Sequence, residues 1–447
     1  MNRIILIGNG FDLAHNLETS YKQFIDNFWK ETIADFKNPE KRGNDIFENI
    51  MLSINIILPI HTQYLQEIQS YNDFTAYFEK EKEFSMRYAT DKKKMSISFK
   101  NRFLKIITEK TSLQNWVDIE EEYYQQIKDI VQNKSQYYSD EGEKTAIAKL
   151  NDDFCQIKNS LKTYLIEKTT EGIGGNAIEF VDDKISKNIY SEFELGDFTK
   201  EGAEQIVNET IKKAQYCLEN KDELEKSDYI DFNTQRLLKL KKEDADIKEI
   251  ILDHNQRKSY FHFIPDSILF LNFNYSNTEN LYAKQKYEVP GYRYGVLTEL
   301  EINKETIHIH GELKNSTSPI IFGYGDESDE VHKEIEKKGG DYLNNVKTIN
   351  YLKTPNYKNL LKFIESGMYQ VFIMGHSCGF SDKTLLNTLF EHENCVSIKP
   401  FFYKWKDENG IEHDDYEDKI KNIYRVFTDK TLMREKVVNK EYCKQLS

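Results

Sequence analysis

The start of the chain places glycines and an aspartate directly after a short apolar run. The run ends in three loop residues, Gly8, Asn9 and Gly10. Glycines let the backbone turn sharply and let its N–H groups approach a phosphate, and the N-terminus of a following helix favours an anion. Leu13 replaces the third glycine of the dinucleotide-binding pattern, so a plain tight turn is the competing interpretation. Asp12 would repel a phosphate and suits a ribose hydroxyl or a helix cap better.

A second apolar run, Ser267–Phe273, contains Asn272 near its end and is followed directly by Asn274, Tyr275 and Ser276. Open α/β sheets place ligand contacts at the carboxyl ends of their strands, which makes Asn274 and Ser276 candidates to contact a ligand. An Asx turn that opens the next helix accounts for the same residues.

Two histidines, His308 and His310, lie at the end of a third apolar run, Thr306–His310. On a strand they would point the same way, as in a metal-binding pair, but the sequence nearby offers no third ligand of the usual kind. We therefore predict no metal site. His310 precedes Gly311 at the strand end, so we expect it to face a cleft as a general base, with His308 structural.

A fourth run ends in Gly375-His-Ser377-Cys-Gly379, which has the spacing of a nucleophile elbow. A Ser hydrolase with its acid and histidine after the serine would have to use His392 or His413. The alternative is a second nucleotide loop. In it, Gly375 and Ser377 contact a ribose or phosphate, and Asp382 lies in the first turn of the next helix.

Continuous apolar runs of this kind are typical of strands buried on both faces of a parallel sheet, and helical patterns between them predict an α/β fold. The fourth run is Val371–Gly375, and the further runs are Pro319–Phe322 and Val396–Lys399. We expect a discontinuous α/β nucleotide-binding core over residues 1–30 and 262–447. Residues 31–261 are poor in Gly and Pro and predict a large α-helical insertion, with one helix between Ala203 and Leu218 and another helical stretch over Leu218–Ile251.

Composition excludes several classes of protein. The chain has 447 residues with 61 Lys+Arg against 75 Asp+Glu, so its net charge of −14 disfavours general binding to nucleic acid or an anionic membrane. Its 5 cysteines form no CxxC pair, which disfavours a disulfide framework or a four-cysteine zinc site. The N-terminus lacks a signal-peptide pattern, and the apolar run Ile54–Ile60 is too short to span a bilayer, so we expect a cytoplasmic protein.

Together these motifs resemble the AbiH family of bacteriophage abortive-infection proteins, which implies antiviral defence. The resemblance is carried by Ile7–His15, Thr19–Tyr21 with Phe24, Trp116–Glu120, Asn272–Tyr275, His308–Gly311, and Gly375–Ser377 with Asp382. Within the stretch Trp116–Glu120, we expect Trp116, Asp118 and Glu120 to form a helix N-cap with a buried Trp rather than to cover the site.

More distantly, the motifs resemble the sirtuin-type NAD-binding fold, which implies a Rossmann-like core. The resemblance implies that Gly8 to Asp12 form the first NAD loop, that Asn274 holds the nicotinamide ribose and that His310 is the catalytic histidine. Gly375 and Ser377 would then contact the adenine ribose and phosphate. Because the zinc cysteines are missing and Ser276 replaces an acidic residue, the resemblance implies NAD hydrolysis rather than deacylation of protein lysines.

Cleavage of the nicotinamide–ribose bond needs ribose positioning more than a nucleophile. We expect Asn274 to position the ribose or a water and His310 to act as general base. The competing hypothesis is a non-catalytic sensor of a nucleotide or a phage component that acts through a partner. A phage-derived trigger and a homo-oligomer are further partners that the sequence leaves open.

Overall fold

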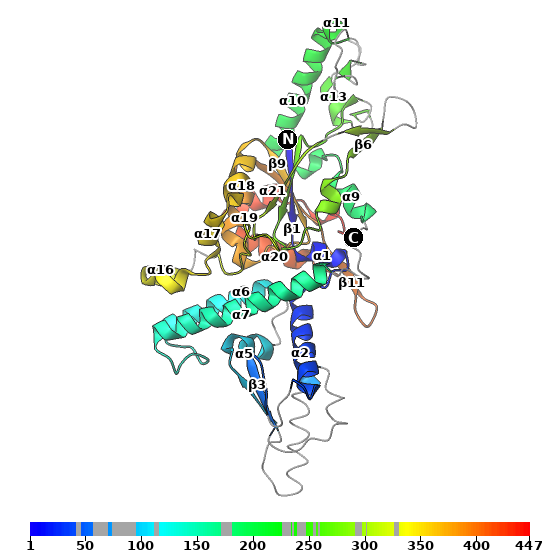
Figure 1. The fold of residues 1–447 in the computed structure, drawn as a ribbon. Coiled ribbons are helices and arrows are strands. Elements are labelled where there is room, and N and C mark those ends of the chain that lie inside the picture. The colour runs from blue at the N-terminus through cyan, green and yellow to red at the C-terminus, as the bar shows by residue number, and fades with distance from the viewer. Residues whose placement is uncertain are drawn as a thin grey trace.

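The computed structural model describes residues 1–41, 46–56, 70–73, 95–110, 116–170, 181–225, 234, 237–238, 247–253, 256–257, 260–290, 297–300, 302–325 and 330–447. Its centre is a five-stranded parallel sheet in the order β10-β9-β1-β5-β8 (Figure 1). The strands are β1 (Asn2–Ile7), β5 (Ser267–Asn272), β8 (Asn303–His308), β9 (Tyr369–Met374) and β10 (Cys395–Pro400). The α/β fold with a Rossmann-like parallel core is therefore confirmed.

The central strand β1 explains why the sheet is buried on both faces. Ile4 and Leu6 point to one face, and Ile5 and Ile7 point to the other. The first face is covered by α18 (Asn356–Glu365), α19 (Lys383–Glu391), α20 (Tyr416–Val426) and α21 (Lys430–Lys436). The second is covered by α1 (Asn9–Ala14), α9 (Asp183–Ile189) and α15 (Asn280–Ala283). α9 lies in the range predicted as insertion, yet it packs on the core sheet.

Four predicted strands after residue 262 are present, but Pro319–Phe322 is not a strand. This segment is irregular, and the Ile321 N–H donates to the carbonyl of His310 at 2.8 Å. Ile321 and Phe322 are buried against the core rather than in a sixth strand. An apolar run indicates burial, and here the burial comes without a ladder of backbone hydrogen bonds.

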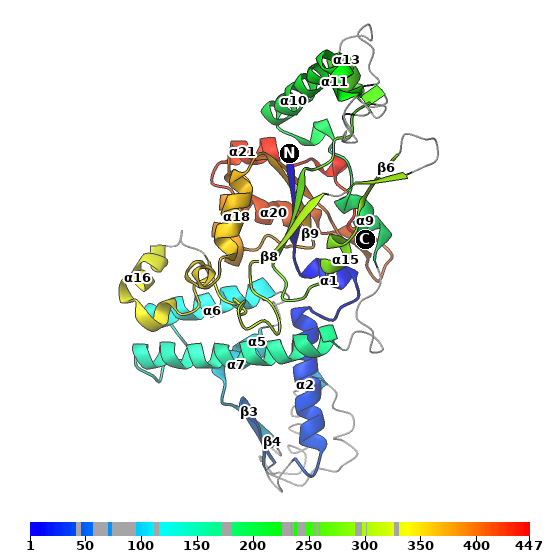
Figure 2. The same cartoon turned by 45° about the horizontal axis from the view of Figure 1, so that its top comes forward.

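A subdomain lies beyond the carboxyl end of the sheet, with α7 crossing beneath the core (Figures 1 and 2). It consists of α2 (Tyr21–Lys37), α5 (Arg102–Glu109), α6 (Trp116–Val131), α7 (Glu143–Thr170) and an antiparallel sheet of β2 (Ile46–Glu48), β3 (Leu52–Ile56) and β4 (Met95–Phe99). This sheet lies within the range predicted to be helical, and α2 runs across the predicted boundary at residue 30.

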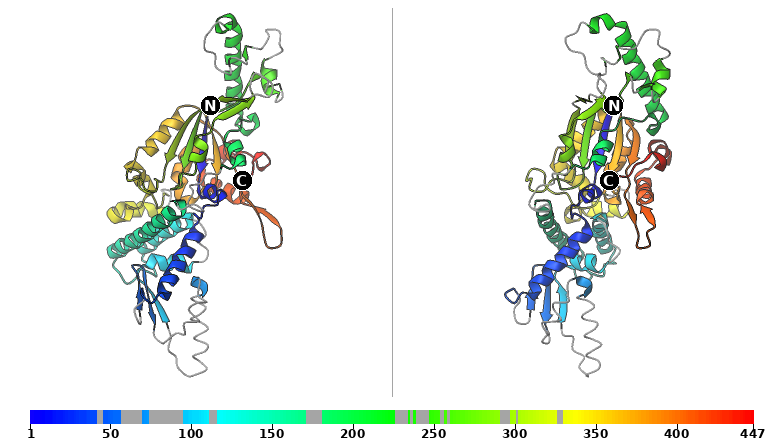
Figure 3. Two further views of the ribbon diagram at one scale, coloured as in Figure 1. Left: turned by 45° about the vertical axis from the view of Figure 1, so that its right-hand side comes forward. Right: turned by 90° about the vertical axis from the view of Figure 1, so that its right-hand side faces the viewer.

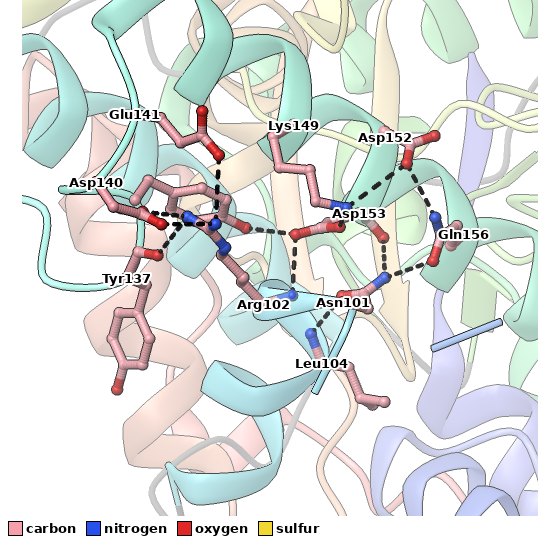
Figure 4. Close-up of polar contacts among 11 residues, drawn as sticks. Asn101, Arg102, Leu104, Tyr137, Asp140, Glu141, Lys149, Asp152, Asp153 and Gln156 are labelled. Atoms are coloured by element: carbon pink, nitrogen blue, oxygen red, sulfur yellow. Dashed lines mark hydrogen bonds and ion pairs between the residues drawn. The ribbon is translucent and has the colours of Figure 1, made fainter. Parts of the chain in front are cut away.

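The start of α5 is fixed to α7 by a buried polar cluster (Figure 4). The Asn101 side chain caps α5 by accepting from the Leu104 N–H at 2.7 Å, and its amide donates to the Asp153 carbonyl at 2.8 Å. The carboxylate of Asp153 accepts from the Arg102 N–H at 2.9 Å and pairs with Lys149 at 2.8 Å. Because Asp153 is fully buried, these partners fix how the subdomain helices pack.

An arm extends from the opposite end of the sheet (Figure 3). It contains α10 (Lys200–Glu219), α11 (Lys221–Leu224) and α13 (Ile247–Leu252), and α10 confirms the helix predicted over Ala203–Leu218. Of the stretch Leu218–Ile251, residues 226–233, 235–236 and 239–246 lie outside the described residues.

The remaining elements are short. The hairpins are β6 (Tyr287–Pro290) with β7 (Leu297–Leu300) and β11 (Lys404–Lys406) with β12 (Glu412–Asp414). The helices are η1 (Leu195–Asp197), α16 (Glu330–Lys338), η2 (Gly340–Leu343), α17 (Lys347–Asn350), η3 (Tyr351–Lys353), η4 (Phe380–Asp382) and η5 (Lys440–Tyr442). Among the described residues, no helix combines the length and apolar character needed to cross a membrane. Residues 57–60 of the apolar run Ile54–Ile60 lie outside the described residues.

Candidate functional site

A cavity of about 460 Å³ lies at the carboxyl edge of the parallel sheet. Residues that follow each of the five strands line it, including Gly8 after β1, Asn274 after β5, His310 after β8, Gly375 after β9 and Phe401 after β10. After β1 the chain adds β5 and β8 on one side of β1, and it later adds β9 and β10 on the other side. The gap between β1 and β9 is therefore the topological switch point, where open α/β sheets bind ligands.

The nine residues that the sequence predicts to be catalytic or to bind the cofactor all line this one cavity, and so does the candidate contact Ser276. The nine are Gly8, Asn9, Gly10, Asp12, Asn274, His310, Gly375, Ser377 and Asp382. They come from four loops that are far apart in the chain, and their catalytic and binding roles stay predictions.

Gly8 in the loop after β1 and Gly375 in the loop after β9 let the backbones of these two loops approach each other closely. A Cβ on Gly8 would lie 2.5 Å from the Cα of His376, and a Cβ on Gly375 would lie 2.0 Å from the backbone nitrogen of Phe11. The N–H groups of Gly8 and Gly10 donate to the carbonyls of Met374 and Gly375. These two N–H groups are therefore engaged within the protein, which differs from the phosphate contact expected from sequence.

Asn274 is fixed at the strand end by both its backbone and its side chain. Its N–H donates to the Asn272 side chain at 2.8 Å, and its side-chain amide donates to the Gly8 carbonyl at 2.9 Å. With its amide nitrogen committed, the side-chain oxygen of Asn274 is the atom available to a ligand. His308 instead pairs with the buried Glu279 at 3.1 Å and does not line the cavity.

His310 has one ring nitrogen held by a carboxylate. Its Nε2 lies 3.1 Å from Oδ1 of Asp382 and 3.3 Å from the hydroxyl of Tyr351. Because Asp382 is an acceptor, we assign the ring proton to Nε2. No hydrogen bond among the described residues engages Nδ1, so its lone pair is available to a ligand in the cavity. Burial and then the charge of Lys347 lower the pKa of His310 below its ordinary value, which favours the neutral ring.

A buried lysine organises the carboxylates around His310. Lys347 Nζ lies 2.7 Å from Asp382 and 2.8 Å from Glu120, and it donates to the Ser381 hydroxyl at 3.1 Å. Burial alone would raise the pKa of the Asp382 carboxyl, but Lys347 and His310 outweigh burial and hold that pKa well below its usual range. Burial and the neighbouring Asp382 raise the pKa of Glu120.

Asp12 is a third buried carboxyl on the lining, after Asp382 and Glu120. Ser276 and Thr278 donate their hydroxyls to its two oxygens at 2.6 and 2.8 Å. Burial raises the pKa of Asp12 to about 6, since these two donors oppose it only in part. The carboxyl can therefore hold or release a proton near neutral pH.

The loop after β9 lacks the geometry of a Ser hydrolase. His376 accepts from the Cys378 N–H through Nδ1, and its Nε2 faces Asp382 at 3.6 Å. Among the described residues, no histidine is hydrogen-bonded to the Ser377 hydroxyl. Burial raises the pKa of the Cys378 thiol to about 12, so this neighbour is not a thiolate nucleophile at neutral pH.

Sequence reasoning missed Lys347 and assigned Glu120 to a helix N-cap. The cap prediction is wrong for Glu120, which lies inside α6, is buried and lines the cavity. A signal was present, because Glu120 shares a helix face with the buried residues Tyr123, Tyr124 and Ile127. Lys347 carries no comparable local signal. The side chain of Trp116 lies outside the described residues.

The chain is similar to a known protein family. A family model described as "Bacteriophage abortive infection AbiH" matches residues 177–404, just over half of the chain. The matched range contains Asn274, His310, Gly375, Ser377 and Asp382. No curated protein and no solved structure matches the chain. The chain therefore belongs to the bacteriophage abortive infection AbiH family, which assigns it a role in defence against phage.

Proposed function

We propose that the cavity binds NAD and hydrolyses it to nicotinamide and ADP-ribose. The observation that carries the proposal is His310 held through Nε2 by Asp382, on the lining of a cavity at the switch point of a doubly wound sheet. Loss of NAD would stop the metabolism of an infected cell, which fits a role in abortive infection.

The reaction breaks the bond between C1′ of the ribose and the nicotinamide nitrogen. Nicotinamide leaves as a neutral molecule with the bonding electron pair, and the ribose ring takes up oxocarbenium character. A water oxygen then bonds to C1′, and the proton it loses goes to Nδ1 of His310. Solvent later takes this proton and restores the neutral histidine.

Three side chains have distinct parts in this mechanism. Asp382 keeps the proton on Nε2, so that Nδ1 is the basic atom. The side-chain oxygen of Asn274 orients the ribose or the attacking water. Lys347 keeps Asp382 ionised. None of these steps requires a nucleophilic side chain or a metal ion.

The test is incubation of the purified protein with NAD, with nicotinamide release followed by chromatography. We expect the wild type and the control variant His392→Ala to release nicotinamide. His310→Ala should lose roughly a hundredfold or more of the rate while its thermal melting shows a folded protein. Absence of both release and calorimetric NAD binding in the wild type would refute the proposal.

A cellular assay separates catalysis from sensing. If hydrolysis is the function, His310→Ala should abolish phage defence. Defence retained by this variant would instead indicate a non-catalytic sensor of a nucleotide or phage component that acts through a partner.

A further inference from the structure

One end of the cavity is not used by the chemistry at His310. His310 follows β8 at one edge of the sheet, whereas Phe401 and Tyr403 follow β10 at the other edge, and all three line the cavity. Five neighbouring strands span about 19 Å between the outer two. A substrate that reaches both edges is therefore elongated, as a dinucleotide is.

Exposed aromatic rings stand at the β10 end. Tyr403 is 55% exposed and Trp405 is 41% exposed, although both are large and partly apolar. Their rings are nearly parallel, at 12°, and Trp405 also stacks on His413 across the hairpin β11–β12. This hairpin projects from the core beside the C-terminus (Figure 3). Exposed aromatic faces of this kind are platforms on which nucleobases stack.

A cation lies on the same part of the lining. Lys419 on α20 is the single Lys or Arg among the described residues that line the cavity. It forms an ion pair with Asp415, whose N–H donates to the Tyr403 carbonyl. Lys419 is also close enough to the loop after β9 for its charge to act on Cys378. It therefore lies close to the switch-point loop and, through Asp415, to the segment that carries Tyr403. A phosphate next to a base stacked there would need such a positive charge.

We infer that this end of the cavity is a subsite for a purine nucleotide, with the phosphate at Lys419 and the base stacked on the Tyr403 ring. The Trp405 ring, nearly parallel to that of Tyr403, holds the tyrosine in place. The inference rests on the proposed function, because it assigns this subsite to the adenylate half of NAD. It also supplies the phosphate contact that the N–H groups of Gly8 and Gly10 do not provide.

Kinetics on two substrates test the subsite. Nicotinamide mononucleotide has the same scissile bond as NAD but lacks the adenylate half. We expect Tyr403→Ala and Lys419→Met each to raise KM for NAD by about tenfold, with kcat and the kinetics on the mononucleotide unchanged. The matched controls are Tyr442→Ala, an exposed tyrosine off the lining, and Lys421→Met, an exposed lysine on the same helix. A wild type that cleaves the mononucleotide as efficiently as NAD would overturn the subsite and leave the cleavage reaction standing.

Titration with AMP tests the subsite without turnover. We expect calorimetry to show AMP binding to the wild type, competition between AMP and NAD, and about tenfold weaker AMP binding in both variants. Absence of AMP binding, equal binding in the variants, or binding that does not compete with NAD would overturn the inference. If the wild type does not cleave NAD, the proposed function fails, and the effect of the variants on AMP binding still decides the subsite.

Discussion

At the scale of single residues, the orientation of His310 depends on one carboxylate. Asp382→Asn keeps the shape of the side chain, but its amide can donate where the carboxylate only accepted, so the preferred histidine tautomer changes. We expect kcat for nicotinamide release to fall by roughly 10²–10⁴ with KM little changed. The exposed Asp222→Asn, on α11 in the arm, is the control. A variant with normal kcat would show that Asp382 is structural.

The buried carboxyl of Asp12 should lower the stability of the folded protein at neutral pH. Its pKa is raised from 3.8 to about 6 in the folded protein, so the folded state holds this proton more tightly than the unfolded chain. The stabilisation from the bound proton is present at low pH and is lost as pH rises from 3.8 through 6, a change of about 3 kcal/mol. A stability cost of this kind is common at functional sites.

We therefore expect Asp12→Asn to become more stable relative to the wild type as pH rises. Urea denaturation at about pH 5 and about pH 8 measures this difference, and the exposed Asp418→Asn should show no such trend. A stability difference that is the same at both pH values would contradict the burial of a protonatable Asp12.

At the scale of elements, the contact between the loops after β1 and β9 depends on Gly375. Its φ is +79°, and a Cβ there would lie 2.0 Å from the Phe11 nitrogen. Gly410 has nearly the same φ, +78°, but its Cβ would meet nothing within 4 Å. Gly410→Ala should therefore lose only the conformational strain, about 1 kcal/mol. Gly375→Ala adds a clash and should lose several kcal/mol in urea denaturation, and equal losses would refute the close approach.

The strands and the loops that follow them also show how much of the fold the sequence predicts. A parallel strand is buried on both faces, so it appears in the sequence as a continuous apolar run and can be recognised there. The polar residues that follow these strands converge because the carboxyl ends of parallel strands lie at the same edge of the sheet. The pairing of Lys347 with Glu120 joins positions 227 residues apart, and no local pattern encodes such a contact. The apolar pattern of Pro319–Phe322 predicts a strand that the structure lacks, because such a run indicates burial but does not specify backbone hydrogen-bond partners.

At the scale of the whole molecule, α6 brings the helical subdomain into the site through Glu120. Glu120→Gln tests this contact, because glutamine can still accept from the Gly323 N–H while the charge beside Lys347 is removed. The negative charge of Glu120 raises the pKa of His310, so its removal should lower that pKa further. The acid limb of the rate profile, which lies below the ordinary histidine value of 6.5 in the wild type, should then move to still lower pH.

The same variant should also be less stable by about 1–3 kcal/mol, since Lys347 keeps only one of its two carboxylate partners. Glu121→Gln, on the exposed side of α6, is the matched control. A loss of stability without a shift of the pH profile would mean that Glu120 only fastens the subdomain to the core. A shift in the profile would mean that a segment over 150 residues before His310 in the chain sets its protonation, so that anything that moves α6 also changes the activity.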